Sequence, residues 1–121
     1  MPITFTIDHS RRQIESVEAG PCGYKDVANH LAREQQTQSL PYRELVDGRD
    51  GVAAFTPDEA RNIVELLRRL EQESKIGRKA IVAPNGIAFA LTRMIEMLTE
   101  DFCEVRAFLD EKEARLWLEQ E

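Results

Sequence analysis

Apolar and polar positions alternate at the start of the chain. From Ile3 to Ile7 every second residue is apolar and the residues between are threonines, which is typical of a strand with one buried face. The segment 13–19 repeats this pattern more weakly, and Gly20 with Pro21 is expected to end it. A short polar turn separates the two segments, so the sequence predicts an antiparallel hairpin.

The period changes to that of a helix from Tyr24 onward. Apolar residues recur at three- and four-residue spacing as far as Leu31, which predicts an amphipathic helix. The stripe is lost over residues 34–39, which we expect to form a frayed helix end and a polar loop. A short strand over residues 42–46 follows, and the run Asp47–Gly51 is expected to close it as a turn.

A second helix begins with a clear start signal. Thr56 is the expected N-cap, Pro57 takes the first helical position, and Glu59 completes a capping box. Gly77 is expected to stop this helix after Lys75. Its core stripe is formed by Ala60, Ile63, Val64, Leu67 and Leu70.

The stretch 78–100 is the most informative part of the chain. Residues 80–83 are continuously apolar, which predicts a strand covered on both faces, and we expect this to be the central strand of a parallel sheet. Pro84 leaves the sheet because it lacks an N–H, and Asn85 is a good N-cap for the next helix.

This third helix has an unusually wide apolar arc. Residues on the expected core face and its flanks span about half of the circumference, more than one sheet face needs. They are Ile87, Leu91, Met94 and Leu98 at the centre, with Ala88, Ala90, Ile95 and Met97 on the sides. Phe89 points away from this arc, between Arg93 and Glu96. It either packs under a neighbouring loop or strand end, or lines a pocket or partner surface.

The end of the chain predicts an edge strand and a last helix. Val105 and Ala107 alternate with charged residues, and Asp110 is expected to cap a helix with Glu113 at its third position. The elements therefore follow the order ββαβαβαβα. This predicts an α/β fold, a mixed five-stranded sheet covered by helices, forming one domain over residues 1–121.

Composition excludes several function classes. Hydrophobic residues make up 42 % of the 121 residues, charged residues 31 %, and the formal net charge is -6. The acidic balance argues against nucleic-acid binding, and without a long apolar run no membrane span is expected, so we expect a soluble cytoplasmic protein. Cys22 and Cys103 lack metal-ligand spacing, which favours two reduced thiols.

Three runs of sequence resemble a known family. They are LVDGRDGVAAFTPDEARNI, RKAIVAPNGIAFALTRM and VRAFLDEKEARLWL. Over residues 40–121 the chain resembles the small bacterial STAS-like proteins, whose fold is that of the anti-sigma-factor antagonists and is sometimes grouped with SEC14-type lipid-binding domains. The resemblance implies a regulatory or ligand-binding module without known catalytic chemistry. Antagonists carry a phosphorylated serine at the start of the second helix, where this chain offers Thr56 as the possible phosphosite; its capping role already explains that residue.

In open α/β sheets ligands bind at the carboxyl ends of the strands, so candidate binding residues are expected there. Asp47 and Asp50 would suit a divalent cation, but aspartate beside glycine is common in turns. Neither His9 nor His30 lies near an obvious nucleophile in the sequence. The sequence therefore predicts no enzyme activity, no cofactor and no metal.

Two function hypotheses remain open. The first is an interaction module that binds a protein partner or forms a homodimer. Its expected surface comprises Asn85, Phe89, Arg93 and Met97, with Asp47 and Arg49. The second is a carrier of a small apolar molecule or lipid, with Phe89, Met94 and Met97 facing a cavity between the helices and the sheet.

Overall fold

The computed structural model describes residues 2–120, and its elements follow the predicted order. The strands are β1 (Ile3–Asp8), β2 (Gln13–Cys22), β3 (Arg43–Ala53), β4 (Lys79–Val82) and β5 (Val105–Phe108). The helices are α1 (Tyr24–Gln36), α2 (Pro57–Glu73), α3 (Gly86–Thr99) and α4 (Glu111–Glu119).

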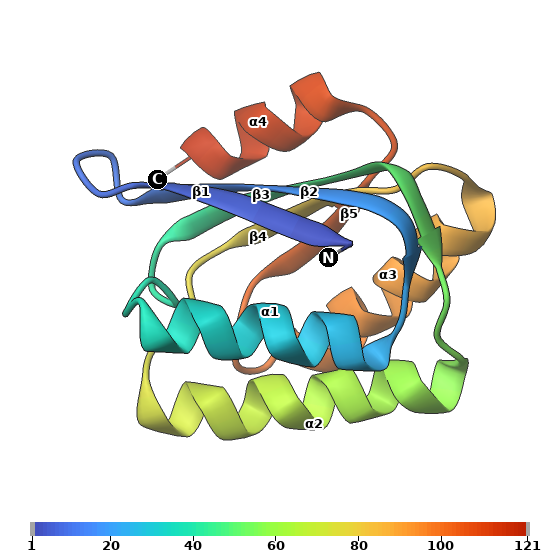
Figure 1. The fold of residues 1–121 in the computed structure, drawn as a ribbon, viewed down its shortest axis with the longest axis horizontal. Coiled ribbons are helices and arrows are strands. Elements are labelled where there is room, and N and C mark those ends of the chain that lie inside the picture. Colours follow the sequence, from blue (N-terminus) through green and yellow to red (C-terminus); the bar gives the residue numbers. More distant parts are fainter. Residues whose placement is uncertain (1, 121) are drawn as a thin grey trace.

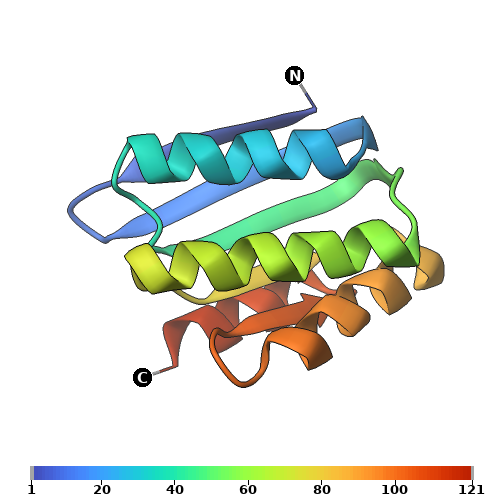
Figure 2. The ribbon, with the colours of Figure 1, turned by 90° about the horizontal axis from the view of Figure 1, so that it is seen from below.

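The five strands form one mixed sheet in the order β1-β2-β3-β4-β5. β1 and β2 pair antiparallel through the predicted hairpin, and the other neighbours are parallel. Figures 1 and 2 show α1, α2 and α3 on one face of the sheet and α4 alone on the other. The α/β prediction and the edge position of β5 are confirmed. The prediction that β4 is central is wrong, because β3 occupies the middle of the sheet.

Each face of the sheet has its own apolar core. The larger one lies under the three helices and draws on α2, with Ile63, Val64 and Leu67 among its buried residues. On the other face Ala114 and Leu118 of α4 pack on residues of β3, β4 and β5. Asp110 caps α4, since its carboxylate accepts a hydrogen bond from the Lys112 N–H at 3.1 Å.

β2 and β3 are longer than the sequence predicted. Each continues through a segment expected to end it: Gly20 and Pro21 in β2, and Asp47–Gly51 in β3. The register moves from Val17 opposite Asp47 to Ala19 opposite Asp50, so β3 carries one extra residue. This bulge absorbs the turn-forming residues without breaking the pairing, which is why the predicted strand ends were wrong.

α1 is also longer than predicted. It runs to Gln36, and Glu34 has 0 % of its surface exposed, although residues 34–39 were expected to be frayed and polar. Ser39, after the helix, is likewise buried. That prediction was wrong because Glu34 finds charged partners in the interior, which the local pattern does not show.

The start of α2 is as predicted. The Thr56 hydroxyl accepts a hydrogen bond from the Glu59 N–H at 3.1 Å, and the Glu59 carboxylate accepts one from the Thr56 N–H at 2.9 Å. This reciprocal pair satisfies two of the free amide groups at the helix N-terminus. The helix ends at Glu73, slightly before the predicted stop.

α3 has the predicted cap but a different buried face. Asn85 accepts a hydrogen bond from the Ala88 N–H at 3.0 Å. The side chains that face the core are Ala88, Thr92, Ile95 and Thr99. This face lies about 100° around the helix from the predicted arc.

The two threonines explain the rotation of α3. The hydroxyl of Thr92 donates to the Ala88 carbonyl at 2.9 Å, and that of Thr99 donates to the Ile95 carbonyl at 2.8 Å. With their polar groups satisfied inside the helix, both residues pack as small apolar ones. A count of apolar residues treats them as polar, so the predicted core face was wrong.

Two further observations concern the whole described range. Both cysteines are free and buried, as predicted for reduced thiols. None of the helices within residues 2–120 combines the length and the apolar character needed to cross a membrane.

Candidate functional site

Five polar side chains meet in the interior between α1 and the sheet. We call Ser16, His30, Glu34, Glu44 and Lys79 the buried cluster; each is at most 5 % exposed. Their elements explain the meeting. His30 and Glu34 are one turn apart on α1, Ser16 lies on β2, and Glu44 pairs with Lys79 across β3 and β4.

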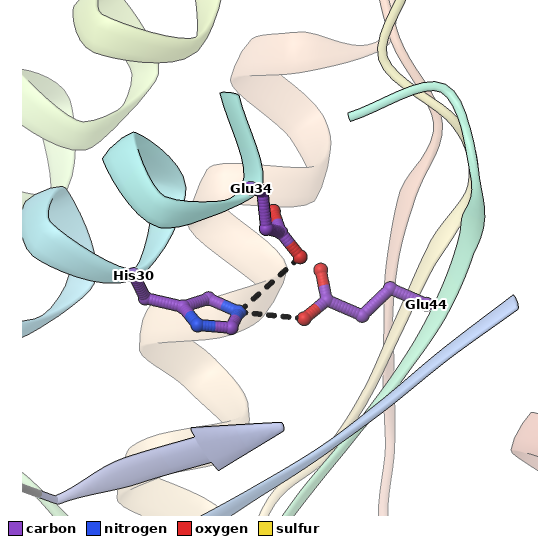
Figure 3. Close-up of side chains that lie close together, drawn as sticks. All are labelled: His30, Glu34 and Glu44. Atoms are coloured by element: carbon purple, nitrogen blue, oxygen red, sulfur yellow. Dashed lines mark hydrogen bonds and ion pairs between the residues drawn. The ribbon is translucent and has the colours of Figure 1, made fainter. Parts of the chain in front are cut away.

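The contacts in the buried cluster are short. The Lys79 ammonium donates to Glu34 Oε1 at 3.0 Å and to Glu44 Oε1 at 2.6 Å. His30 Nε2 lies 2.6 Å from Glu44 Oε2 and 3.3 Å from Glu34 Oε2, as Figure 3 shows. The Ser16 hydroxyl donates to Glu44 Oε2 at 2.5 Å. Two carboxylates thus share two basic groups.

The charges of the buried cluster balance one another. Burial alone would lower the pKa of His30, but hydrogen bonds to the carboxylates of Glu34 and Glu44 raise it to about 9, so the imidazole is protonated at neutral pH. Burial would likewise raise the pKa of Glu44, yet the Lys79 ammonium and His30 hold it well below its usual value. Burial and the nearby charge of Glu44 raise the pKa of Glu34. The two basic groups therefore lie against the two carboxyl groups, which limits the cost of burying charge here.

The buried cluster offers the donor atoms of a metal site, but its carboxylates already have cationic partners. One ligand atom each from His30, Glu34 and Glu44 lie within 4.8 Å of one another. However, the Lys79 ammonium already sits against both carboxylates, and those carboxylates raise the pKa of Lys79 despite its burial. A metal ion would have to displace a cation that fits this space. The geometry therefore favours a self-contained ion cluster.

The contacts of Ser16 and His30 differ from those of a catalytic triad. The sequence shows no obvious nucleophile beside His30, but in the fold Ser16 Oγ lies 3.4 Å from His30 Nε2. In a catalytic triad the acid binds Nδ1 and the serine faces Nε2. Here Glu44 and Ser16 both face Nε2, while Nδ1 has no hydrogen-bond partner among the described residues. The arrangement therefore differs from that of a Ser-His-acid triad.

A cavity of about 120 Å³ adjoins the buried cluster. It lies between the three-helix layer and the sheet, near the carboxyl ends of β3 and β4, and its wall is mostly apolar. Ala88, Thr92 and Ile95 of α3 line it. The predicted lining by Phe89, Met94 and Met97 is wrong, because the rotation of α3 turns those side chains elsewhere.

The predicted surface residues fall into two groups. Asp47 and Arg49 lie on the face of α4, where Arg49 contacts Asp47 at 2.8 Å and Glu111 at 2.5 Å. The Arg49 hydrogen bonds hold the pKa of Asp47 below its usual value. A guanidinium therefore takes the place at Asp47 that a divalent cation would need.

The other group is on α3. Asn85 caps the helix, Phe89 is half-buried, and Met97 is 59 % exposed. Arg93 pairs with Glu96, whose carboxylate also accepts a hydrogen bond from the Ala107 N–H of β5 at 2.9 Å. No hydrogen bond or ion pair within residues 2–120 joins this group to Asp47 and Arg49. The role of these residues as an interaction surface stays a prediction, as does Thr56 as a phosphosite.

The buried cluster was not predicted from the sequence. A signal was present, since Glu44 and Lys79 lie in otherwise apolar strand segments, where a charged residue is rarely buried without a partner. The sequence did not show which residues are the partners of Glu44 and Lys79. Glu34 on α1 and Lys79 on β4 are far apart in the sequence and meet only when the helix packs on the sheet.

No protein-family model matches the chain, and no curated protein matches its sequence. Two solved structures resemble it in shape. An uncharacterised DUF3478-family protein with a SpoIIAA-like fold, from Shewanella loihica PV-4, has 18 % identity over 96 % of this chain and 93 % of its own, with a TM-score of 0.60. The anti-sigma factor antagonist SpoIIAA in its unphosphorylated form has 13 % identity over 96 % of each chain and a TM-score of 0.52. The chain has a SpoIIAA-like fold.

The SpoIIAA-like fold confirms the STAS-like resemblance at the level of architecture. At these low identities the likeness establishes the fold alone. One fold hosts many functions, so the function has to be argued from the residues of this chain.

Proposed function

We propose that residues 1–121 form a single non-catalytic regulatory domain of the cytoplasm, which acts by binding a protein partner or a second copy of itself. The observation that carries this proposal is the exposed apolar face of α3. Ile87 is 78 % exposed, Met97 59 % and Leu98 42 %. Large apolar side chains that share one helix face and remain in solvent favour a binding surface.

The chemistry of this face supports protein binding. Ile87 and Leu98 lie on one side of α3, and the flexible side chain of Met97 widens the stripe. Methionine adapts its shape to a partner, which is common on binding surfaces. The exposed Arg93 flanks the stripe and offers a charged group for its rim.

The interior supports a non-catalytic role. Titratable groups with shifted pKa values meet in the buried cluster, where they bond to one another and where Ser16 is 1 % exposed. Perturbed groups of this kind serve catalysis when they meet substrate. These side chains serve the packing of α1 on the sheet instead.

The test uses a double variant, Ile87→Glu with Met97→Glu. Both side chains are exposed, so the fold should persist while association with a second copy or a partner is lost. Native mass spectrometry reads the dimer, and capture with the purified chain as bait reads the partner. The matched control is Leu116→Glu, because Leu116 is 58 % exposed on α4 at the opposite face of the sheet. Unchanged association in the α3 variant would remove this surface.

A second variant addresses the residues predicted from the sequence. Phe89→Ala with Arg93→Ala changes the side of α3 that faces β5. Loss of association in this variant, with association retained in the Ile87 and Met97 variant, would place the binding surface near the edge of the sheet. Retention of association in both variants would contradict binding through α3.

The cavity favours a second candidate function, a carrier of a small apolar molecule. Its volume of about 120 Å³ suits a compact ligand rather than a lipid chain. Native mass spectrometry of freshly purified protein tests this candidate, because a bound molecule would appear as added mass that denaturation removes. Failure of any apolar probe to bind would count against it.

A further inference from the structure

One charged side chain on the cavity wall has no partner that balances it. Four ionisable side chains line the cavity, and His30, Glu44 and Lys79 are neutralised within the buried cluster. The fourth is Glu18. Within residues 2–120 its carboxylate makes no ion pair of 4.0 Å or less, and the side chain that hydrogen-bonds to it is the uncharged thiol of Cys22, so no positive charge pairs with Glu18.

The β3 bulge makes room for this carboxylate. Glu18 lies on β2 opposite the extra residue of β3, between the pairs Val17–Asp47 and Ala19–Asp50. A Cβ atom on Gly48 would lie 3.0 Å from Glu18 Oε1 and 2.8 Å from the Val82 carbonyl oxygen. Glycine at this position therefore allows the carboxylate to lie against the backbone of β3. Bulges of this kind often re-aim a side chain near a site.

The surroundings make an unpaired carboxylate costly at this place. Burial raises the pKa of Glu18 above its ordinary value, opposed by the neighbouring Cys22 thiol. The positive charge of His30 lowers the pKa of Glu18, and the negative charges of Glu44 and Asp47 raise it. A bound cation would reverse this cost, because an opposite charge nearby favours the ionised form.

The rest of the cavity wall determines what the cation must carry. Apolar side chains from three helices and the sheet surround the space, among them Val27, Leu31, Val46, Phe55, Ile63 and Ile95. A closed apolar cavity of roughly 150 Å³ accepts benzene, so the present volume of about 120 Å³ suits a compact apolar group. A metal ion or a strongly hydrated cation would leave this wall unused.

We propose that the cavity binds a small organic amine, with its ammonium group at the Glu18 carboxylate and its compact apolar body against the apolar wall. The proposal rests on the carrier function above and adds the chemical class of the ligand. An anionic ligand is disfavoured by Glu18, and the Lys79 ammonium is already engaged with Glu34 and Glu44. A neutral ligand of the same shape fills the space but leaves Glu18 without a counter-charge.

The experiment compares three probes of one shape and different charge. Propylamine, 1-propanol and propionate, all smaller than benzene, are titrated into the complete chain at neutral pH, with binding followed by amide chemical shifts. Propylamine should bind roughly tenfold more tightly than 1-propanol, as a charge-assisted hydrogen bond predicts, and propionate should bind most weakly. The shifts should centre on Gly48, Gly51 and Thr92, which line the cavity.

Variants of β2 isolate the role of the carboxylate. Glu18→Gln should abolish the preference for propylamine while leaving 1-propanol binding unchanged, and Glu18→Ala serves as a second variant if the first folds poorly. Glu15→Gln is the matched control. Glu15 lies on the same strand but pairs with Arg115 on the other face, so the preference should persist there.

The outcomes separate the two proposals. Equal binding of propylamine and 1-propanol in the native chain and in Glu18→Gln would overturn the amine assignment and leave the carrier function standing. Binding of no probe would overturn both. Shifts located outside the cavity would overturn the assignment of the site, whatever the affinity.

Discussion

Charged side chains hold helices to both faces of the sheet, with contacts of similar length. On the α1 face, Lys79 contacts Glu34 at 3.0 Å and Glu44 at 2.6 Å, and these side chains are 0–7 % exposed. On the α4 face, Arg115 contacts Glu111 at 2.8 Å and Glu15 at 2.9 Å, with side chains 30–49 % exposed. The difference lies in burial alone.

Burial changes what such a contact does for the fold. Between exposed groups, water and salt weaken the attraction, and pairs contribute about 0–1 kcal/mol. In the interior the attraction and the desolvation penalty are both large, so removing one partner costs about 3–5 kcal/mol. The buried cluster therefore behaves as a unit that fixes α1 against β3 and β4, whereas the surface contacts are individually dispensable.

The largest expected effect comes from Lys79→Met. The substitution keeps most of the side-chain volume but leaves Glu34 and Glu44 with His30 as their sole cation in the cluster. We expect the free energy of unfolding to fall by about 3–5 kcal/mol, measured by urea denaturation at neutral pH. Lys75→Met, at an exposed lysine, is the control. A loss below about 1 kcal/mol for Lys79→Met would show that the interior contacts behave like surface ones.

The protonation of His30 gives the next effect. Its pKa is raised from 6.5 to about 9, so its stabilising contribution is complete below the unfolded-state value and is lost as pH rises through about 9. The shift corresponds to a fall in the free energy of unfolding of about 3 kcal/mol over this window. Urea denaturation across the window measures it.

His30→Gln is the control for this pH dependence. The variant keeps a hydrogen-bonding side chain but has no charge to lose, so the fall in stability over the window should disappear. A native chain whose stability stays level between about pH 6.5 and about pH 9 would contradict a protonated His30.

A smaller effect is expected on the opposite face. Arg115→Ala removes the contacts to Glu111 and Glu15 at once, yet it should lower the free energy of unfolding by less than about 1 kcal/mol, because all three side chains are partly exposed. Urea denaturation measures this beside Lys79→Met. A loss equal to that of Lys79→Met would remove the contrast between the two faces.

Added salt should produce the smallest effect and sharpen the comparison further. At about 1 M NaCl the screening length is about 3 Å, so the difference in unfolding free energy between the native chain and Arg115→Ala should shrink toward zero. The difference for Lys79→Met should persist, because ions do not enter the interior. Equal salt sensitivity in both variants would indicate that water reaches the buried cluster.

The cap residues show which parts of the fold could be predicted from the sequence. Thr56, Asn85 and Asp110 start their helices as predicted, since an N-cap is decided by a side chain and an amide a few residues away. The alternation in β1 was equally local. Features of this kind follow from neighbours in the chain, and the order of elements followed from them.

α3 shows where prediction from the local sequence failed. Its apolar residues predicted one buried face, but Thr92 and Thr99 turn inward and Ile87 turns outward. Which face is buried depends on how closely α3 approaches its neighbours, and small residues allow the close approach. The candidate site was missed for a related reason, since Glu18 and Glu34 look like ordinary surface charges in the sequence.

By itself the sequence determined the elements, their order and the mixed α/β architecture, because periodicity and capping act over a few residues. The tertiary structure decided the pairing of Glu34 with Lys79, the bulge opposite Glu18 and the cavity beside them. These features depend on the register between strands and on the burial of charge. Both are set by contacts between residues distant in the chain, where local pattern carries no information.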